Sequence, residues 1–371
     1  MLSNWLHRAL FPVSLLLVLV IAGCGAKSSG SIVEGKVNAV TTFYPIYEFT
    51  KEIGGEDANV INLLPVGVEP HDWTPRSQDI VNTSKAQLFL YNGAGLEGWV
   101  PGFLKGLDSD SKVQSVEVSK GVNLIMTDED DGHNHGSAAE DHEGEEAGHD
   151  HEGEAEHAHE GEEVGHEHEG EEAGHDHEGE AEHAHEGEEA EAASGDSLHT
   201  DPHTWVSPKS ALVMAGNIRD SLQAADPEHK DGYEERYNKL AERLKALDVK
   251  FEQELAKLPG KEIVVSHQAF AYLARDYGLT QHAIMGLSPD AEPRGQDMVK
   301  LASMVKEEGI KYIFFEELVS DRLAKTLAAE AGVSTMVLNP VEGLTEEQDK
   351  NADNYFTLME KNLQNLILAL Q

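Results

Sequence analysis

Three histidines stand in contexts that are typical of metal ligands. His71 and His203 each occupy the centre of an acid-Pro-His-x-Trp motif, and His267 follows the apolar run 263–266. Proline restricts its own φ and forces the preceding residue into an extended conformation, so each motif presents its His from a stiff loop. Neutral imidazole is a preferred ligand of Zn²⁺ and of other transition metals. The pattern therefore indicates a metal site.

The other histidines have less informative contexts. Fourteen of the 20 lie between His133 and His199, mostly as His-x-His pairs. His7 precedes an apolar N-terminal run, His229 lies in a charged helical context, and His282 has no motif around it, so we expect His282 to be structural. A single isolated His is more often structural than ligating. Two copies of one unusual motif and a His at the end of a strand favour a shared site.

These histidines need elements that bring them together. Apolar runs separated by amphipathic stretches predict strands that alternate with helices, and hence parallel sheets built from βαβ units. The expected fold class is α/β, with two lobes that each hold a parallel sheet flanked by helices and are joined by one long helix. In such sheets, ligands bind beyond the carboxyl ends of the strands, where the three histidines can converge.

The expected elements can be placed along the sequence. A hydroxyl residue before Pro predicts helix starts at Thr74-Pro75 and Ser207-Pro208. A charged periodic stretch at 231–258 predicts the long helix. The expected strands are 36–42, 59–64, 88–91, 262–266, 311–315 and 334–338, and further helices are expected at 268–277, at 320–331 and from about Glu346.

The N-terminus predicts export and lipidation. Arg8 is followed by an apolar run at 9–22 that is too short to span a bilayer and has the length of a secretory signal. The run ends in a sequence that resembles a bacterial lipobox, with Cys24 as the lipidated residue. Cys24 is the only Cys, so a disulfide within the chain and a thiolate metal site are excluded. More than one acyl chain on Cys24 would give stable membrane anchoring.

The segment 128–198 differs in composition from the rest of the chain. It contributes most of the formal charge of −41, has no Lys, Arg or aromatic residue, and repeats 144–163 as 170–189. Such a composition predicts disorder, and its His and carboxylate groups predict weak, rapidly exchanging zinc binding. The large negative charge also excludes nucleic acid as a partner. The expected organisation is a signal peptide (1–23), a tether (24–35), an N-terminal lobe (36–127 and 199–230) interrupted by the insertion (128–198), the linking helix (231–258) and a C-terminal lobe (259–371).

Several motifs together resemble one family. Thr42-Phe43-Tyr44-Pro45, the segments 67–73 and 201–205, and the run 266–270 are similar, in order and spacing, to zinc-binding lipoproteins of the ZnuA/AdcA type. The resemblance implies a monomeric extracytoplasmic receptor that is lipid-anchored to the bacterial cell membrane. Such a receptor captures Zn²⁺ as cargo and delivers it to the permease of an ABC-type importer.

The resemblance also implies a ligand set. The His of each family motif corresponds to His71, His203 and His267, and a family Glu corresponds to Glu342 in the loop Asn339–Leu344. Members without that Glu use water or the acid before the first His, here Glu69. Three His and one carboxylate in a tetrahedral set suit Zn²⁺. Related manganese and iron binders carry an acid where this chain has His267, so that position is implied to discriminate between metals.

Two other functions compete with the receptor hypothesis. An exported zinc hydrolase would need three protein ligands, an open coordination position and a general base. Glu69 or Asp72 are nominal bases, but the chain has no His-Glu-x-x-His helix. An adhesin or surface zinc buffer would use the acidic segment as its main functional part. A complete folded site favours the receptor, with no enzymatic activity.

Overall fold

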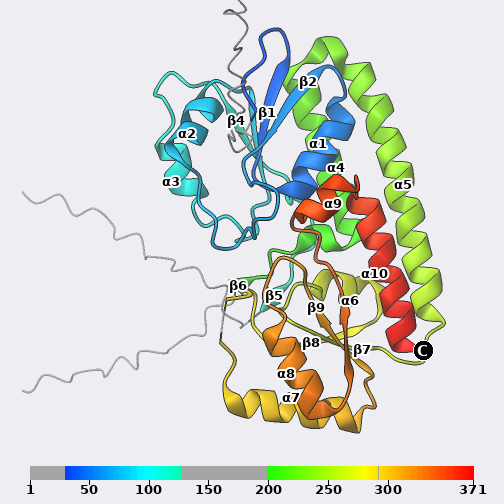
Figure 1. Cartoon of the computed structure of the whole chain (residues 1–371). Coiled ribbons are helices and arrows are strands. Elements are labelled where there is room, and N and C mark those ends of the chain that lie inside the picture. Colours follow the sequence, from blue (N-terminus) through cyan, green and yellow to red (C-terminus); the bar gives the residue numbers. More distant parts are fainter. Residues whose placement is uncertain (1–29, 128–198, 291) are drawn as a thin grey trace, which may run out of the picture. The chain divides into compact units, whose positions relative to one another are not determined.

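The computed structural model describes residues 30–127, 199–290 and 292–371. Within them, two four-stranded parallel sheets, each flanked by helices, form two lobes (Figure 1). The predicted α/β class is therefore confirmed. The expected signal peptide, Cys24 and the expected insertion lie outside the described residues.

The first sheet has the order β2-β1-β3-β4. Its central strands β1 (Val37–Thr41) and β3 (Leu88–Tyr91) are largely buried apolar runs, as expected for parallel strands covered on both faces. The edge strands are β2 (Ala58–Asn62) and β4 (Gln114–Glu117). The helices that accompany this sheet are α1 (Tyr44–Gly54), α2 (Ser77–Ser84) and α3 (Val100–Lys105).

The second sheet has the order β10-β9-β7-β8. Its strands are β7 (Glu262–Val265), β8 (Thr280–Ala283), β9 (Tyr312–Phe315) and β10 (Ser334–Val337). The helices that alternate with these strands are α6 (Ala271–Tyr277), α7 (Gly295–Glu307) and α8 (Arg322–Ala331). Two helices follow β10, namely the short α9 (Glu346–Lys350) and the longer α10 (Tyr355–Leu370).

Long helices connect the two lobes. Helix α4 (Pro208–Ala225) leads through the turn Pro227–His229 into α5 (Lys230–Ala256), which packs against α1 and α4 and, further along, against α6 and α10 (Figure 1). The buried side chains of α5 recur at helical spacing, and they belong to a hydrophobic cluster that includes residues of both sheets. The predicted long helix is thus present within two residues of its expected ends.

A short antiparallel ladder stands apart from both parallel sheets. It pairs β5 (Met126–Thr127) with β6 (His199–Thr200). The chain next to this ladder is held by the second lobe, because the Tyr272 hydroxyl on α6 accepts a hydrogen bond from the Ile125 N–H and donates one to the Asp201 carbonyl. The ladder therefore leads directly into the loop that carries His203.

Several expected helix boundaries were wrong. The helices expected at 268–277 and 320–331 begin at Ala271 and Arg322, and two other differences have a local cause. The helix predicted to start at Pro75 begins at Ser77, because the Asp79 carboxylate accepts the Arg76 N–H at 2.7 Å and caps the helix there. The single final helix predicted from Glu346 is two helices. It breaks at Ala352, where φ is positive, and restarts at the Asn354 cap. The start predicted at Ser207-Pro208 is confirmed, since the Ser207 hydroxyl accepts the Lys209 N–H.

Candidate metal centre

His71 lies in the loop that follows β2. Its backbone N–H donates to both carboxylate oxygens of Glu69 at 3.0 Å, which folds the acid-Pro-His motif onto itself. The Trp73 N–H donates to the Pro70 carbonyl and closes the turn. The imidazole is 4 % exposed. The stiff loop expected from the sequence therefore presents a buried ring.

His203 is held by a carboxylate two residues earlier. Asp201 Oδ1 accepts the backbone N–H of His203 at 2.9 Å and lies 3.0 Å from its ring Nδ1. Asn92, directly after β3, donates to the Pro202 carbonyl and accepts from the Thr204 hydroxyl, so the first sheet fixes the loop from the other side. His203 and Asp201 are both fully buried.

His267 lies just beyond the carboxyl end of β7, where the fold class placed it. Its ring Nδ1 is 2.6 Å from Glu316 Oε1, and the Ser266 hydroxyl hydrogen bonds to the same oxygen. Glu316 follows β9, the neighbouring strand. The sequence indicated His267 but not Glu316, because nothing in the local sequence around Glu316 marks it.

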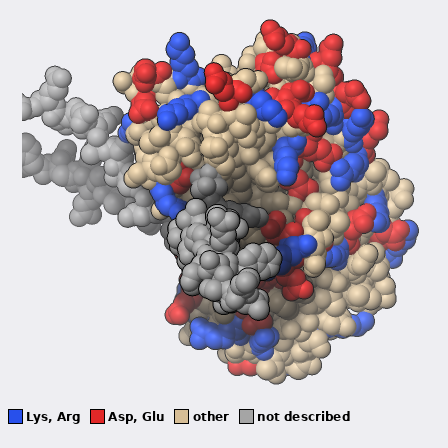
Figure 2. All heavy atoms as spheres, turned by 45° about the horizontal axis from the view of Figure 1, so that its top comes forward, with Lys and Arg blue, Asp and Glu red and all other residues tan. Residues whose placement is uncertain are grey.

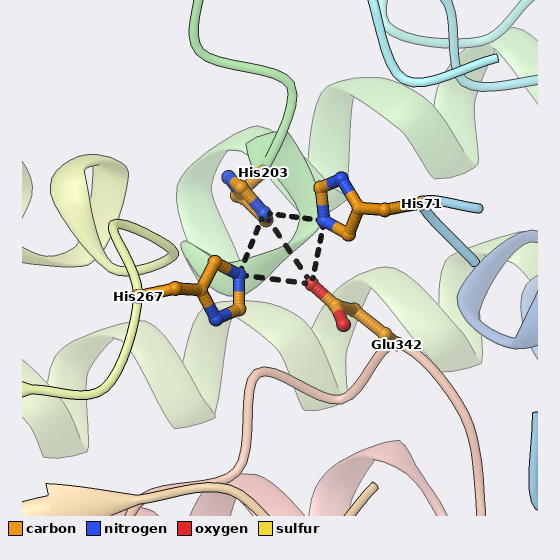
Figure 3. Close-up of side chains that lie close together, drawn as sticks. All are labelled: His71, His203, His267 and Glu342. Atoms are coloured by element: carbon orange, nitrogen blue, oxygen red, sulfur yellow. Dashed lines mark hydrogen bonds and ion pairs between the residues drawn. The ribbon is translucent and has the colours of Figure 1, made fainter. Parts of the chain in front are cut away.

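Glu342 comes from the loop after β10. The Asn339 side chain accepts the Val341 N–H at 2.7 Å, and the Trp205 indole donates to the Pro340 carbonyl at 2.7 Å. Val341 has a φ of 60°, which is an unfavourable backbone conformation for a β-branched residue. The loop is thus constrained from both lobes, and it points a carboxylate that is 2 % exposed toward the three imidazoles (Figure 3).

The four side chains converge on one point. His203 Nε2 lies 3.2 Å from the Nε2 atoms of both His71 and His267. Glu342 Oε1 lies 3.6, 3.3 and 3.7 Å from the Nε2 atoms of His71, His203 and His267. A tetrahedral ion about 2.0–2.2 Å from each donor would separate the donors by about 3.3–3.6 Å. These five donor separations, 3.2–3.7 Å, are close to those of a tetrahedral zinc site.

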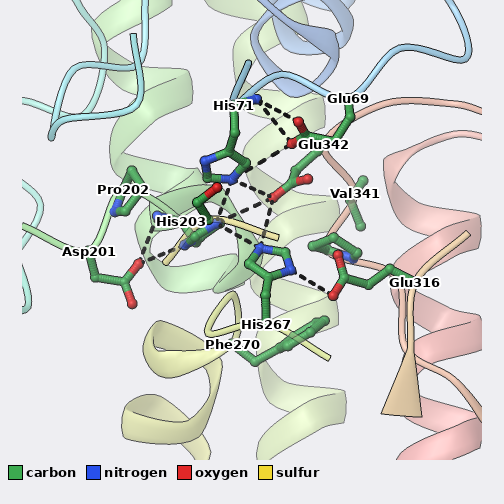
Figure 4. A network of polar contacts seen from close by, with 12 residues as sticks. Glu69, His71, Asp201, Pro202, His203, His267, Phe270, Glu316, Val341 and Glu342 are labelled. Atoms are coloured by element: carbon green, nitrogen blue, oxygen red, sulfur yellow. Dashed lines mark hydrogen bonds and ion pairs between the residues drawn. The ribbon is translucent and has the colours of Figure 1, made fainter. Parts of the chain in front are cut away.

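The protonation pattern of the cluster also fits a cation. Two imidazoles turn Nδ1 toward a carboxylate, Asp201 or Glu316, and turn Nε2 toward the centre (Figure 4). A neutral ring that donates through Nδ1 carries its lone pair on Nε2, so lone pairs would face one another at 3.2 Å. Glu342 Oε1 is buried without a hydrogen-bond partner among the described residues. A metal ion would satisfy all of these atoms at once.

Burial and charge act against each other on the pKa values of these groups. Burial alone would raise the pKa of Glu342, but the close approach of the three imidazoles holds it well below its usual range. Burial alone would lower the pKa of His267, but the Glu316 carboxylate raises it. The pKa of His71 is lowered, with burial as the largest cause. The carboxylate is therefore charged at neutral pH, as a metal ligand must be.

Glu69 borders the cluster without joining it. Its Oε1 lies 3.9 Å from His71 Nε2, whereas Glu342 Oε1 approaches all three rings. Burial and the charge of Glu342 raise the pKa of Glu69 to about 8. Glu69 also lines a cavity of about 700 Å³, together with Asp72 and Asp290, so this cavity lies beside the cluster.

The remaining candidates lie elsewhere. His282 Nε2 pairs with Glu262 at 2.6 Å, half-buried in the second sheet, and His229 pairs with Asp226 at the start of α5. Cys24 lies outside the described residues. Asp201 and Glu316 were not among the predicted site residues, although each touches one of the converging imidazoles.

Comparison with known proteins identifies the class of protein. Residues 39–369 match the family model of the zinc-uptake complex component A, periplasmic. The chain belongs to this family, which confirms the resemblance seen in the motifs.

Individual relatives agree with this assignment. The zinc-binding lipoprotein AdcA of Streptococcus pneumoniae serotype 4 is 39% identical over 358 residues, 95% of this chain but 60% of the relative. The chain therefore spans less than two thirds of AdcA. The high-affinity zinc uptake system protein ZnuA of Bacillus subtilis is 35% identical over 93% of this chain and 92% of its own. The Zn(II)-bound ZnuA-like domain of S. pneumoniae AdcA superimposes with a TM-score of 0.64 at 35% identity, covering 91% and 99% of the two chains.

Proposed function

We propose that this protein is a high-affinity zinc receptor outside the cytoplasm that captures Zn²⁺ as cargo for an ABC-type importer. The observation that carries the proposal is the convergence of four buried donor atoms from His71, His203, His267 and Glu342. They come from loops of both lobes, and their separations fit a tetrahedral ion. Relatives named as zinc-binding and zinc-uptake proteins support the choice of metal.

The donor chemistry favours zinc over harder cations. Three imidazoles and one carboxylate suit Zn²⁺, whereas Mn²⁺, Mg²⁺ and Ca²⁺ prefer sites richer in oxygen. Four protein ligands also leave a tetrahedral ion no position for a reactive water, which a zinc hydrolase requires. The site is therefore better suited to holding a metal than to activating a nucleophile, and we propose no enzymatic activity.

The remaining parts of the proposal concern how the receptor reaches its cargo and partner. We propose that Cys24 carries the lipid anchor, that the protein acts as a monomer, and that its partner is the permease of the importer. No helix among the described residues is long and apolar enough to cross a bilayer. The face in Figure 2 carries basic and acidic side chains side by side, whereas the segment 128–198 has acidic residues and no Lys or Arg. We propose that this segment is an accessory zinc-acquiring region.

Metal analysis of protein purified without added metal tests the proposal. We expect one zinc ion per chain that survives dialysis against a moderate chelator, together with weaker ions that do not. Competition with a high-affinity chromophoric chelator gives the affinity of the retained ion. Purified protein that holds no zinc against the moderate chelator, or that holds manganese in preference, would contradict the assignment.

A further inference from the structure

Glu316 is a buried carboxylate to which the ligand set assigns no role. It is 2 % exposed, follows β9 directly and is not one of the four converging side chains. Its Oε1 contacts Nδ1 of His267, the ring atom turned away from the cluster (Figure 4). Its Oε2 is buried and makes no hydrogen bond among the described residues. Burying a charge with an unpartnered oxygen is unfavourable for folding, so the residue calls for a functional reason.

The register of the second sheet sets this contact. Strands β7 and β9 run parallel with Val264 opposite Ile313. Continued three residues, past the strand ends at Val265 and Phe315, the same register brings His267 level with Glu316. Both side chains therefore emerge together beyond the carboxyl edge of the sheet, and neither depends on a flexible loop for its position.

The geometry of the contact determines which ring nitrogen faces the metal. A carboxylate 2.6 Å from Nδ1 accepts its proton, so the Nε2 lone pair is directed into the cluster. The Ser266 hydroxyl hydrogen bonds to the same Oε1 and limits rotation of the carboxylate. A negative charge behind the ring also makes the imidazole a stronger donor to a metal.

We propose that Glu316 is a positioning residue that fixes the tautomer and orientation of His267 and thereby sets the zinc affinity of the cluster. The inference rests on the proposed zinc-binding function and adds to it a residue outside the ligand set. Loss of an outer-shell partner of this kind typically weakens metal binding by about 10-fold to 100-fold.

The chain offers a matched control in the same sheet. Glu262 lies 2.6 Å from Nε2 of His282, the same type of contact at the same distance, but at the opposite end of β7 from the cluster. Both of those side chains are 33% exposed. Glu262→Gln removes the same charge from the same sheet without touching a converging imidazole.

The test compares Glu316→Gln, Glu316→Leu and Glu262→Gln with the unmodified full-length chain. Zinc affinity is measured with half an equivalent of zinc per chain against a high-affinity chromophoric chelator, so that weaker sites stay empty. We expect about 10-fold weaker binding for Glu316→Gln, which keeps an acceptor but loses the charge, and about 100-fold for Glu316→Leu. Glu262→Gln should bind within about twofold of the unmodified chain.

Two further measurements separate positioning from a purely structural role. The thermal midpoint of each metal-free variant shows whether it folds. If Glu316→Leu does not fold, the comparison rests on Glu316→Gln. The visible absorption spectrum of bound Co²⁺ reports the ligand geometry, and it should change in the Glu316 variants but not in Glu262→Gln. Folded Glu316 variants with unchanged affinity and Co²⁺ spectrum would overturn the inference, as would an equal loss in Glu262→Gln. Absence of a tight site in the unmodified chain would overturn the proposed function itself.

Discussion

Replacing His203 with Ala tests the cluster at the ring that both other imidazoles approach. His203 Nε2 lies 3.2 Å from the Nε2 atoms of His71 and His267, and its ring is fully buried. Zinc sites built from four protein ligands bind with about 10–16 kcal/mol, or about 2.5–4 kcal/mol for each ligand. At about 1.4 kcal/mol for each tenfold change, the zinc affinity of His203→Ala should fall by about 60-fold to 700-fold.

The same substitution should affect the metal-free protein much less. Asp201 Oδ1 would lose its ring partner but keep the backbone N–H of residue 203, so we expect a loss of about 1–3 kcal/mol in the free energy of unfolding. Chelator competition measures the affinity and denaturant unfolding measures the stability, with His282→Ala as a control outside the cluster. A folded His203→Ala protein that binds zinc within tenfold of the unmodified chain would refute the ligand assignment.

Three other predictions address different parts of the chain. Cys24→Ala should abolish labelling by a fatty-acid probe and release the protein from the membrane fraction, and continued labelling would rule out Cys24 as the anchor. Deletion of residues 128–198 should leave one tight zinc site and remove the weaker ones, because every proposed ligand lies outside the deletion. Metal content at saturation counts the zinc sites, and chelator competition measures the affinity of the tight one. Loss of the tight site would place it in the deleted segment. Burial raises the pKa of Glu97 to about 7 from an ordinary value of 4.5, although the Thr42 hydroxyl and the N–H groups of Asn92 and Gly93 donate to it. As the pH rises, the unfolded chain therefore loses this proton before the folded protein does. The raised pKa contributes about 3 kcal/mol to the free energy of unfolding, and this contribution is fully present below pH 4.5 and lost by about pH 7. Denaturant unfolding of the metal-free protein at several pH values measures this loss. The free energy of unfolding should fall less steeply with pH in Glu97→Gln than in the unmodified chain, and identical slopes would contradict the assignment.

The sequence predicted the elements that are buried on both sides. Strands β1, β3, β7 and β9 are apolar runs, and each was expected within two residues of its observed ends. The edge strands β2 and β10 were also expected, at 59–64 and 334–338. The other two edge strands, β4 and β8, were not expected, because their half-exposed sequences, QSVE and TQHA, lack a continuous apolar run. A strand without a continuous apolar run is therefore missed when strands are predicted from apolar runs alone.

The candidate site could be predicted only in part, because only some of its residues are marked by their local sequence. The His71 and His203 motifs are local, since their stiffness comes from an adjacent Pro and acid. Glu342 entered through a family resemblance, and its position in space depends on contacts with Trp205 and Asn339. Glu316 depends on the register of two strands far apart in the sequence, which no local pattern encodes.

The ladder of β5 and β6 has a consequence for how this protein can vary. Antiparallel pairing holds Thr127 and His199 opposite each other, about 5 Å apart, so the ladder can accept connections of very different lengths between them. Selection can lengthen, shorten or replace that connection without disturbing the packed lobes. The same junction is a natural place to graft a reporter domain, and because Asp201 and His203 follow it within a few residues, such a graft could convert zinc capture into an optical signal.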